Sequence, residues 1–297
     1  MPEPSLLSRG WAAFLDLVRR VYDKAGEDDI FFMAGAIAFN VIVAVVPLLL
    51  TCMGIAGFLL RQRFGDPAAV LRGFILSGLP SSPELAQFVE STLRGLLAQS
   101  ASFLSVGTLL LVFFATRLIG TLRTALREIF DLTQDRGIIG GKLFDMRMVL
   151  ATGALFAVNV GITVGVDLVS TVRLSVLGYE LYEPGFVQRF VGEALAFLSV
   201  WTMFLLIYRY LPARRTGWET SVVAATFTAV LFEVMKQVFS LYVTRWADYR
   251  STYGGLATLV VLVLWIYYSA VGFILGGEVA QVVAMKRIRR RQKERLG

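Results

Sequence analysis

Long apolar runs alternate with short charged segments along the chain. The first run, residues 31–60, contains no charged side chain, and a helix needs only about 20 apolar residues to cross the hydrocarbon core of a bilayer. Five further runs are predominantly apolar and are bounded by charged residues or by Gly and Pro. They lie at about 101–116, 148–172, 187–208, 221–244 and 254–285. The pattern therefore predicts six transmembrane helices.

These runs are expected to be helices and not strands. An open sheet would leave unpaired backbone groups in lipid, and the runs lack the alternation, about ten residues long, of barrel strands. The composition agrees, because 56% hydrophobic and 17% charged residues are unusual for a soluble domain of 297 residues. The predicted fold class is all-α: a polytopic membrane protein with six transmembrane helices and additional amphipathic helices at the membrane surface.

The distribution of basic residues predicts the orientation. Segments on the side of the two termini contain 20 Lys and Arg residues, and segments on the opposite side contain 8. Basic residues accumulate on the cytoplasmic side, so both termini are expected in the cytoplasm. The first residues lack a short apolar core followed by a cleavage site, so no cleaved signal peptide is expected.

This topology divides the chain into three parts. They are a cytoplasmic amphipathic segment at 1–30, a transmembrane domain at 31–285 and a basic cytoplasmic tail at 286–297. Inside the transmembrane domain, 61–100 form an outer helical loop and 117–147 a cytoplasmic helix. Proline after an N-cap residue, as in Asp66-Pro67 and Ser82-Pro83, predicts two helices in the outer loop. We expect these helices to dock on the bundle; a functional lid and a docking site for an envelope protein are the alternatives.

Two cytoplasmic segments have the pattern of interfacial helices. Residues 8–24 place apolar side chains at helical spacing on one face, and residues 117–131 repeat the pattern. In the second segment Arg123 and Arg127 stand four residues apart, where like charges repel, which favours an anionic neighbour such as a lipid headgroup. A plain solvated face is the alternative interpretation.

The tail KRIRRRQKERLG carries seven basic residues and one acid directly after the last apolar run. Segments of this kind bind the anionic inner leaflet, so Arg289, Arg290 and Arg291 are predicted to contact lipid headgroups. No aromatic residue interleaves these charges, and nucleic-acid binding is not expected.

Cysteine and histidine usage restricts the chemistry. The chain has a single cysteine, Cys52, and no histidine. The chain cannot form an intrachain disulfide. The absence of histidine also argues against zinc sites, nucleophilic triads and acid-base relays that use His. Because there is also no nucleotide-binding loop, we expect no metal, no cofactor, no direct use of ATP and no enzymatic activity.

Charged residues inside the apolar runs are the candidate functional groups. Glu233 and Lys236 lie three residues apart in the fifth run, so they share a helical face and can neutralise each other. Ionised groups at this depth are costly and should face the bundle interior or water. A polar pathway and a purely structural pair both remain open. Other polar groups at membrane depth are Asn40, Asn159, Asp167, Glu193 and Glu278, of which the last three lie nearer the ends, and a structural role is favoured for Glu278.

Small residues predict how the helices pack. Gly161 with Gly165, and Gly272 with Gly276, form GxxxG motifs that let neighbouring helices approach closely. Pro47 lies inside the first run, where it predicts a kink or break near residues 44–46.

Several stretches resemble the YihY/BrkB family of bacterial inner-membrane proteins. They are AGAIAFNVIVAVVPLLL at 34–50, RLIGTLRTALREIFD at 117–131, YRYLP at 208–212, FEVMKQVFSLYV at 232–243 and YRSTYGGLATLVVLVLWIYYSAVGFILGGEVA at 249–280. The last ends in Leu275-Gly276-Gly277-Glu278, similar to the Leu-Gly-Ala-Glu that is usual in the family. Asn40 stands where the family usually has an aromatic residue. The resemblance implies six spans, cytoplasmic termini and a bacterial inner membrane.

The resemblance leaves the activity open. An old ribonuclease label in the family disagrees with the absence of histidine and of a soluble RNA-binding domain, whereas links to envelope lipid traffic favour a lipid-related role. Our first hypothesis is a translocator of lipid or another amphiphile, with a pathway through Glu233, Lys236, Asn40, Asn159 and Asp167. The alternative is a non-transporting membrane scaffold for envelope assembly, and a membrane enzyme comes third. Membrane lipids are the expected partners; the oligomeric state is left open.

Overall fold

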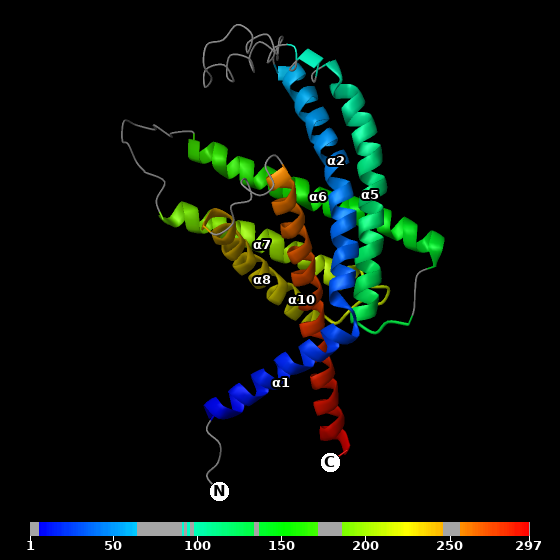
Figure 1. Ribbon diagram of the computed structural model, residues 1–297, viewed down its shortest axis with the longest axis vertical. Coiled ribbons are helices and arrows are strands. Elements are labelled where there is room, and N and C mark those ends of the chain that lie inside the picture. Colours follow the sequence, from blue (N-terminus) through cyan, green and yellow to red (C-terminus); the bar gives the residue numbers. More distant parts are fainter. Residues whose placement is uncertain are drawn as a thin grey trace. The chain divides into compact units, whose positions relative to one another are not determined.

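The computed structural model describes residues 6–63, 98–133, 137–171, 186–245 and 256–296, with 91, 94 and 95. Within these ranges the side chains of some residues lie outside the description, namely 6–14, 60, 61, 63, 138, 156–171, 186–193, 243–245, 258, 290, 295 and 296. Every element in this part of the chain is a helix, which confirms the all-α prediction there (Figure 1). The helices are α1 (Leu6–Glu27), α2 (Ile30–Arg63), α5 (Ser100–Ile129), α6 (Ile138–Thr171), α7 (Phe186–Tyr210), α8 (Trp218–Arg245) and α10 (Ala257–Leu296).

Helices occupy all six predicted apolar runs. Among the described residues, four stretches are long and apolar enough to cross a membrane, and a shorter apolar stretch covers Ala194–Tyr210 of α7. The four are Ile30–Leu59, Ser100–Ile129, Trp218–Tyr242 and Leu259–Glu294. The chain is therefore a helical membrane protein, and the number of six spans stays a prediction.

Two helices are longer than the sequence pattern predicted. The segment expected to form a separate helix at 117–131 continues α5 to Ile129, because the lone Gly120 does not interrupt a helix of otherwise good formers. The basic tail likewise continues α10 to Leu296, since Lys, Arg, Gln and Glu have high helix propensity. Helix α1 covers residues 8–24, and its position along a membrane surface stays a prediction.

Proline does not break the first apolar helix. Helix α2 runs without interruption through Pro47, so a break near residues 44–46 is absent, and the alternative of a kink there stays a prediction. The hydroxyl of Thr51 donates a hydrogen bond of 2.8 Å to the carbonyl of Pro47, one turn earlier. Bonds of this kind keep polar groups satisfied inside apolar helices.

The chain forms two compact units. The smaller, Phe39–Leu118, contains most of α2 and the first part of α5. These two helices run side by side in opposite directions (Figure 1), and two glycines allow their contact. A Cβ atom on Gly54 would lie 2.5 Å from the backbone nitrogen of Leu104, and one on Gly107 would lie 2.8 Å from that of Thr51. No larger residue fits between the backbones at these points.

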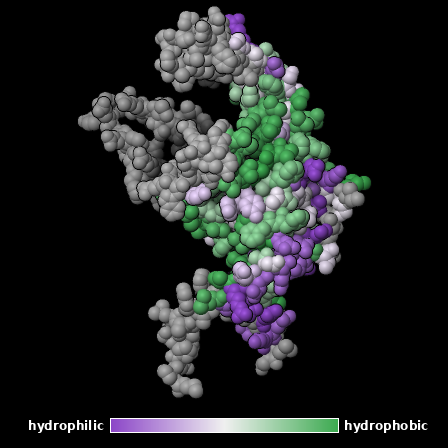
Figure 2. All heavy atoms as spheres, in the orientation of Figure 1, coloured by the Kyte–Doolittle hydropathy of each residue, from purple (hydrophilic) through white to green (hydrophobic). Residues whose placement is uncertain are grey.

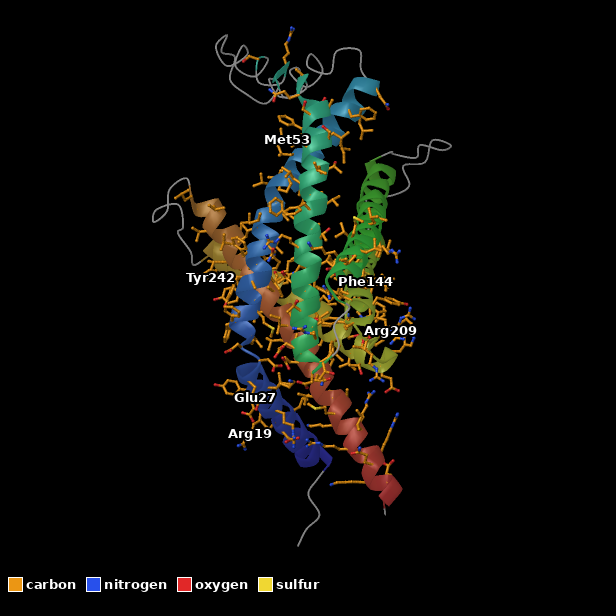
Figure 3. All side chains as sticks on the ribbon, turned by 90° about the vertical axis from the view of Figure 1, so that its right-hand side faces the viewer. Arg19, Glu27, Met53, Phe144, Arg209 and Tyr242 are labelled. Atoms are coloured by element: carbon orange, nitrogen blue, oxygen red, sulfur yellow. The ribbon has the colours of Figure 1, made fainter. Side chains whose placement is uncertain are left out.

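The larger unit comprises Met1–Ala38 and Ile119–Gly297. In it α8 packs against both α7 and α10, α1 packs against α10, and α6 packs against α7. Figure 1 and Figure 3 both show α1 beside the C-terminal half of α10, and Arg19 and Glu27 are labelled on α1 in Figure 3.

Tyr208 of α7 joins three helices in the core of the larger unit. Its side chain is fully buried, and its ring stacks on Phe273 of α10 with ring centroids 4.9 Å apart. The hydroxyl donates to the backbone carbonyl of Phe273. Because a tyrosine has one hydroxyl proton, the 2.8 Å bond between Tyr208 and Thr228 of α8 then has Thr228 as its donor.

Two consecutive glycines bring α10 into contact with its neighbours. A Cβ atom on Gly276 would overlap the Thr228 hydroxyl oxygen and lie 2.9 Å from that of Tyr208. A Cβ atom on Gly277 would lie 3.0 Å from Ile129 at the end of α5. The backbone of α10 therefore touches α7 and α8 through Gly276 and α5 through Gly277. Gly272, one turn earlier, meets Met235 and Leu231 of α8, which is the kind of contact that the GxxxG spacing predicts.

A buried ion pair links α5 to α6. The guanidinium of Arg123 donates to both carboxylate oxygens of Asp145, at 3.0 and 3.2 Å. Only 14% and 4% of these side chains are exposed. Gly141 leaves room for the arginine, because a Cβ atom there would lie 2.8 Å from its Nη2 atom.

The contact at Gly276 predicts a large effect of a single methyl group. Gly276→Ala should lower the free energy of unfolding by about 1–3 kcal/mol, since two hydroxyl groups must move apart to admit it. Thermal unfolding in detergent, followed by circular dichroism, measures the change. Gly153→Ala in α6 is the matched control, because nothing lies within 4 Å of its added Cβ atom. Equal effects of the two substitutions would contradict the packing described.

The Arg123–Asp145 pair predicts non-additive effects. Asp145→Leu alone should destabilise by about 3 kcal/mol, because it leaves a buried guanidinium without its carboxylate. The double variant Arg123→Met/Asp145→Leu should recover most of that loss, since no unpaired charge remains. The same unfolding measurement on the three proteins tests this, and a double variant that is less stable than Asp145→Leu would contradict it.

Candidate functional site

Glu233 and Lys236 form the ion pair that their spacing predicts. The ammonium nitrogen of Lys236 lies 2.8 Å from Glu233 Oε2, within α8. Neither side chain points into the core: 44% of Glu233 and 53% of Lys236 are exposed. The pair neutralises its own charge within α8, and no contact to a second helix is seen for it among the described residues.

The pair belongs to a longer band of polar side chains on α8. Thr226, Glu233, Gln237 and Ser240 follow at intervals of seven, four and three residues, which places them on one face, with Lys236 at its edge. We call these five residues the α8 stripe. Trp201 of α7 donates its indole N–H to Thr226 at 3.0 Å, so the stripe begins where α7 touches α8.

The α8 stripe is long enough to cross most of a bilayer. Thr226 and Ser240 are separated by about 21 Å along the helix axis, at 1.5 Å per residue. Both lie in Trp218–Tyr242, one of the stretches able to span the membrane. Four of the five side chains are exposed and Glu233 is half-buried. A band of this length cannot face hydrocarbon at low cost, so it requires water, a headgroup or another polypeptide beside it.

The other side of α8 borders an apolar groove. The groove lies between α8 and α10 and encloses about 600 Å³. Aromatic contacts form part of it, since the rings of Phe239 and Trp265 are 5.1 Å apart at their centroids. Tyr242, labelled in Figure 3, lies at its end. The remaining lining residues are Val234, Met235, Val238, Leu241, Leu264 and Tyr268. Helix α8 therefore carries a polar face and, on its far side, a surface suited to acyl chains.

For the other predicted pathway residues, a position beside the α8 stripe stays a prediction. Asn40 is half-buried in α2, in the smaller compact unit. Asn159 and Asp167 are on α6 and Glu193 is on α7, where the side chains lie outside the described residues. The same holds for Gly161 and Gly165.

The predicted headgroup contacts differ in their surroundings. The anionic neighbour of Arg123 is the carboxylate of Asp145, where the sequence suggested a lipid phosphate. Arg127 is half-buried in the last turn of α5. Arg289 and Arg291 are exposed on α10, and the side chain of Arg290 is outside the description. Figure 2 shows hydrophilic residues gathered at the C-terminal end of α10. Lipid contact by these arginines stays a prediction.

Glu278 is a candidate that the sequence analysis undervalued. Its position near the end of the last apolar run favoured a headgroup-facing, structural residue, but the side chain is 0% exposed. Neither carboxylate oxygen has a hydrogen-bond partner. Gly276 and Gly277 were the signal in the sequence that could have predicted this burial, because they bring α10 close to its neighbours and so bury the residue that follows.

Charged residues from three other segments surround Glu278. They are Lys24 of α1, Asp28 in the α1–α2 turn and Asp131 after α5. Lys24 pairs with Asp28 at 2.9 Å and with Asp131 at 3.4 Å, and Gln281 donates to Asp131 at 3.1 Å. Burial acts to lower the pKa of Lys24, but the hydrogen bond to Asp28 and the charges of Asp28, Glu278 and Asp131 together outweigh burial and raise it. Among the described residues, no group of three or more His, Cys, Asp or Glu side chains is arranged to hold a metal ion.

Known proteins resemble this chain over nearly its full length. It is 24% identical to a UPF0761 membrane protein of Aggregatibacter aphrophilus, covering 92% of this chain and 93% of the relative. It is 27% identical to one of Tolumonas auensis, over 98% and 92% of the two chains. A Pseudomonas aeruginosa protein of the same description is 28% identical over 92% of this chain and 63% of its own. No solved structure matches. The family model described as virulence factor BrkB matches residues 21–296, and this membrane protein therefore belongs to the BrkB family.

Proposed function

We propose that this protein is an inner-membrane translocator that passes a lipid, or another amphiphile with a charged headgroup, along the α8 stripe. In this proposal both termini face the cytoplasm, six helices cross the membrane, and the protein acts without a cofactor, nucleic acid or covalent chemistry. Membrane lipids are its partners, with the basic end of α10 on the anionic inner leaflet.

The α8 stripe is the observation that carries the proposal. A transmembrane helix that only packs in a bundle does not need five polar side chains along about 21 Å of its exposed face. Hydrated or headgroup-lined paths do need them, because each polar group lowers the cost of moving a charged headgroup through the hydrocarbon layer.

The ion pair suits a headgroup that carries both charges. Opening the 2.8 Å bond between Glu233 and Lys236 would leave two unpaired charges at membrane depth. A zwitterionic headgroup replaces both partners at once: its ammonium pairs with Glu233 and its phosphate with Lys236. The substrate therefore compensates for the bond that it breaks. The groove between α8 and α10 offers apolar surface for the chains of a lipid on the other side of the helix.

A scaffold is the second candidate, and the intrahelical pairing favours it. Because Glu233 and Lys236 neutralise each other within α8, the stripe is complete without a substrate. A polar helix of an envelope protein, or of a second copy, would then cover the stripe permanently. In that case the protein moves nothing and serves as a docking platform.

Reconstitution separates the two candidates. The purified protein in liposomes containing anionic lipid should move a labelled phospholipid between leaflets faster than empty liposomes. Glu233→Gln/Lys236→Met should reduce this rate at least tenfold. Its stability should stay within about 1 kcal/mol of the wild type, because both charges are removed together and neither is left unpaired. Lys142→Met, the same chemical change on an exposed lysine near the start of α6, is the control that keeps the rate.

Two outcomes would count against translocation. If no protein, including the wild type, moves lipid faster than empty liposomes, transport of this substrate class is excluded. If the double variant moves lipid at the wild-type rate, the path does not run along the α8 stripe.

A further inference from the structure

Glu278 is buried with an incomplete set of interactions. A carboxylate normally accepts several hydrogen bonds, yet both oxygens of this fully buried group lack a partner. An ionised carboxylate without donors in a dry site is strongly disfavoured. Its backbone cannot move away, because Gly276 and Gly277 hold α10 against α5, α7 and α8. Some ligand must therefore supply the missing interaction.

The charges around Glu278 show which ligand fits. From α1 it faces Lys24, from the α1–α2 turn Asp28, and from the end of α5 Asp131. The neighbouring Gln281 is neutral, and the hydroxyl of Tyr208 on α7 is engaged by Thr228 and Phe273. Three carboxylates thus share one ammonium group, which leaves an excess of negative charge in a largely buried cluster. That ammonium group lies within ion-pair distance of both Asp28 and Asp131.

We propose that Glu278 is a proton-binding site of this protein. The neutral carboxyl donates its O–H to the carboxylate of Asp28, which supplies the hydrogen bond that Glu278 lacks. When the proton leaves, the O–H bond of Glu278 breaks, both electrons stay on the carboxylate, and water takes the proton. This site lies outside the α8 stripe, so it does not rest on the translocation proposed above.

The cluster is open to solvent at Asp131. The side chain of Asp131 is 60% exposed and is bonded to both Lys24 and Gln281, so protons from bulk water can reach this edge of the cluster. Its backbone adopts a φ of 50°, a left-handed conformation that Asp tolerates better than most residues. Asp131 therefore lies at the exposed end of the cluster.

Loss of the proton should loosen the contact between α1 and α10. Ionised Glu278 competes with Asp28 and Asp131 for Lys24, the last basic residue of α1. At the other end of the contact, the pair of Lys286 with Asp16, at 2.7 Å, remains undisturbed. The cluster thus couples the protonation of α10 to the docking of α1.

The stability of the protein as a function of pH tests the site. The folded protein holds a proton on Glu278 that the unfolded chain has already released above about pH 4.3, the ordinary value for glutamate. The wild type should therefore lose stability from about pH 4.3 upwards, and the loss should level off where Glu278 of the folded protein ionises, which marks the midpoint of the transition. Glu278→Gln keeps the shape, donates to Asp28 and has no proton to lose, so its stability should not fall in that range. Glu219→Gln, on an exposed carboxylate, should keep the wild-type slope.

Two neighbouring substitutions should move the transition in opposite directions. Lys24→Met removes the nearest cation and should raise its midpoint by about one pH unit, whereas Asp28→Asn removes a nearby anion and should lower it by about the same amount. These shifts are measured within each variant, so they do not depend on its absolute stability. Shifts in the same direction, or none, would overturn the proposal.

Infrared spectroscopy of the folded protein gives a direct readout. The band of a neutral carboxyl group should be present in the wild type at neutral pH, disappear at alkaline pH and be missing from Glu278→Gln. A spectrum unchanged by that substitution would show that Glu278 carries no proton, whatever its effect on stability.

Discussion

The close approach of α10 to its neighbours at Gly276 and Gly277 is the constraint on which the larger unit depends. With no side chain at either position, the backbone of α10 meets the hydroxyls of Thr228 and Tyr208 on one side and Ile129 on the other. In a membrane the hydrophobic effect gives little drive for helices to associate, so contact of this kind and buried hydrogen bonds hold the bundle. The same contact buries the side chain that follows.

Charge at membrane depth is handled in two different ways. On α8 the pair of Glu233 and Lys236 is exposed and neutral as a unit, which makes it available to a ligand of matching charges. On α10 Glu278 is enclosed and lacks a donor, among acids that outnumber the one ammonium group. The first arrangement suits recognition of a large zwitterionic group, and the second suits a ligand as small as a proton. The two sites use different faces and different helices, so they can be tested separately.

Helix positions followed closely from the sequence, whereas the functional geometry followed only in part. The apolar runs located the long helices because a segment in hydrocarbon that is not part of a closed barrel can pair its own backbone groups only as a helix. The spacing of Glu233 and Lys236 predicted their bond, since residues three apart on a helix always face the same way. Their exposure was not predictable, because it depends on which faces of α8 the neighbouring α7 and α10 cover. The partner of Arg123 was missed for the same reason: Asp145 is 22 positions away, on another helix.

What the sequence determined by itself is the helical membrane class and the local pairs, because these depend on composition and on spacing within one helix. Tertiary structure decided that Glu278 is buried. Read along the chain, it stands near the end of an apolar run, where a glutamate can reach water. Only the packing of α1, α5 and α7 around α10 removes that water and places Lys24, Asp28 and Asp131 beside it. Burial depends on several segments at once, so it cannot be predicted from one segment alone.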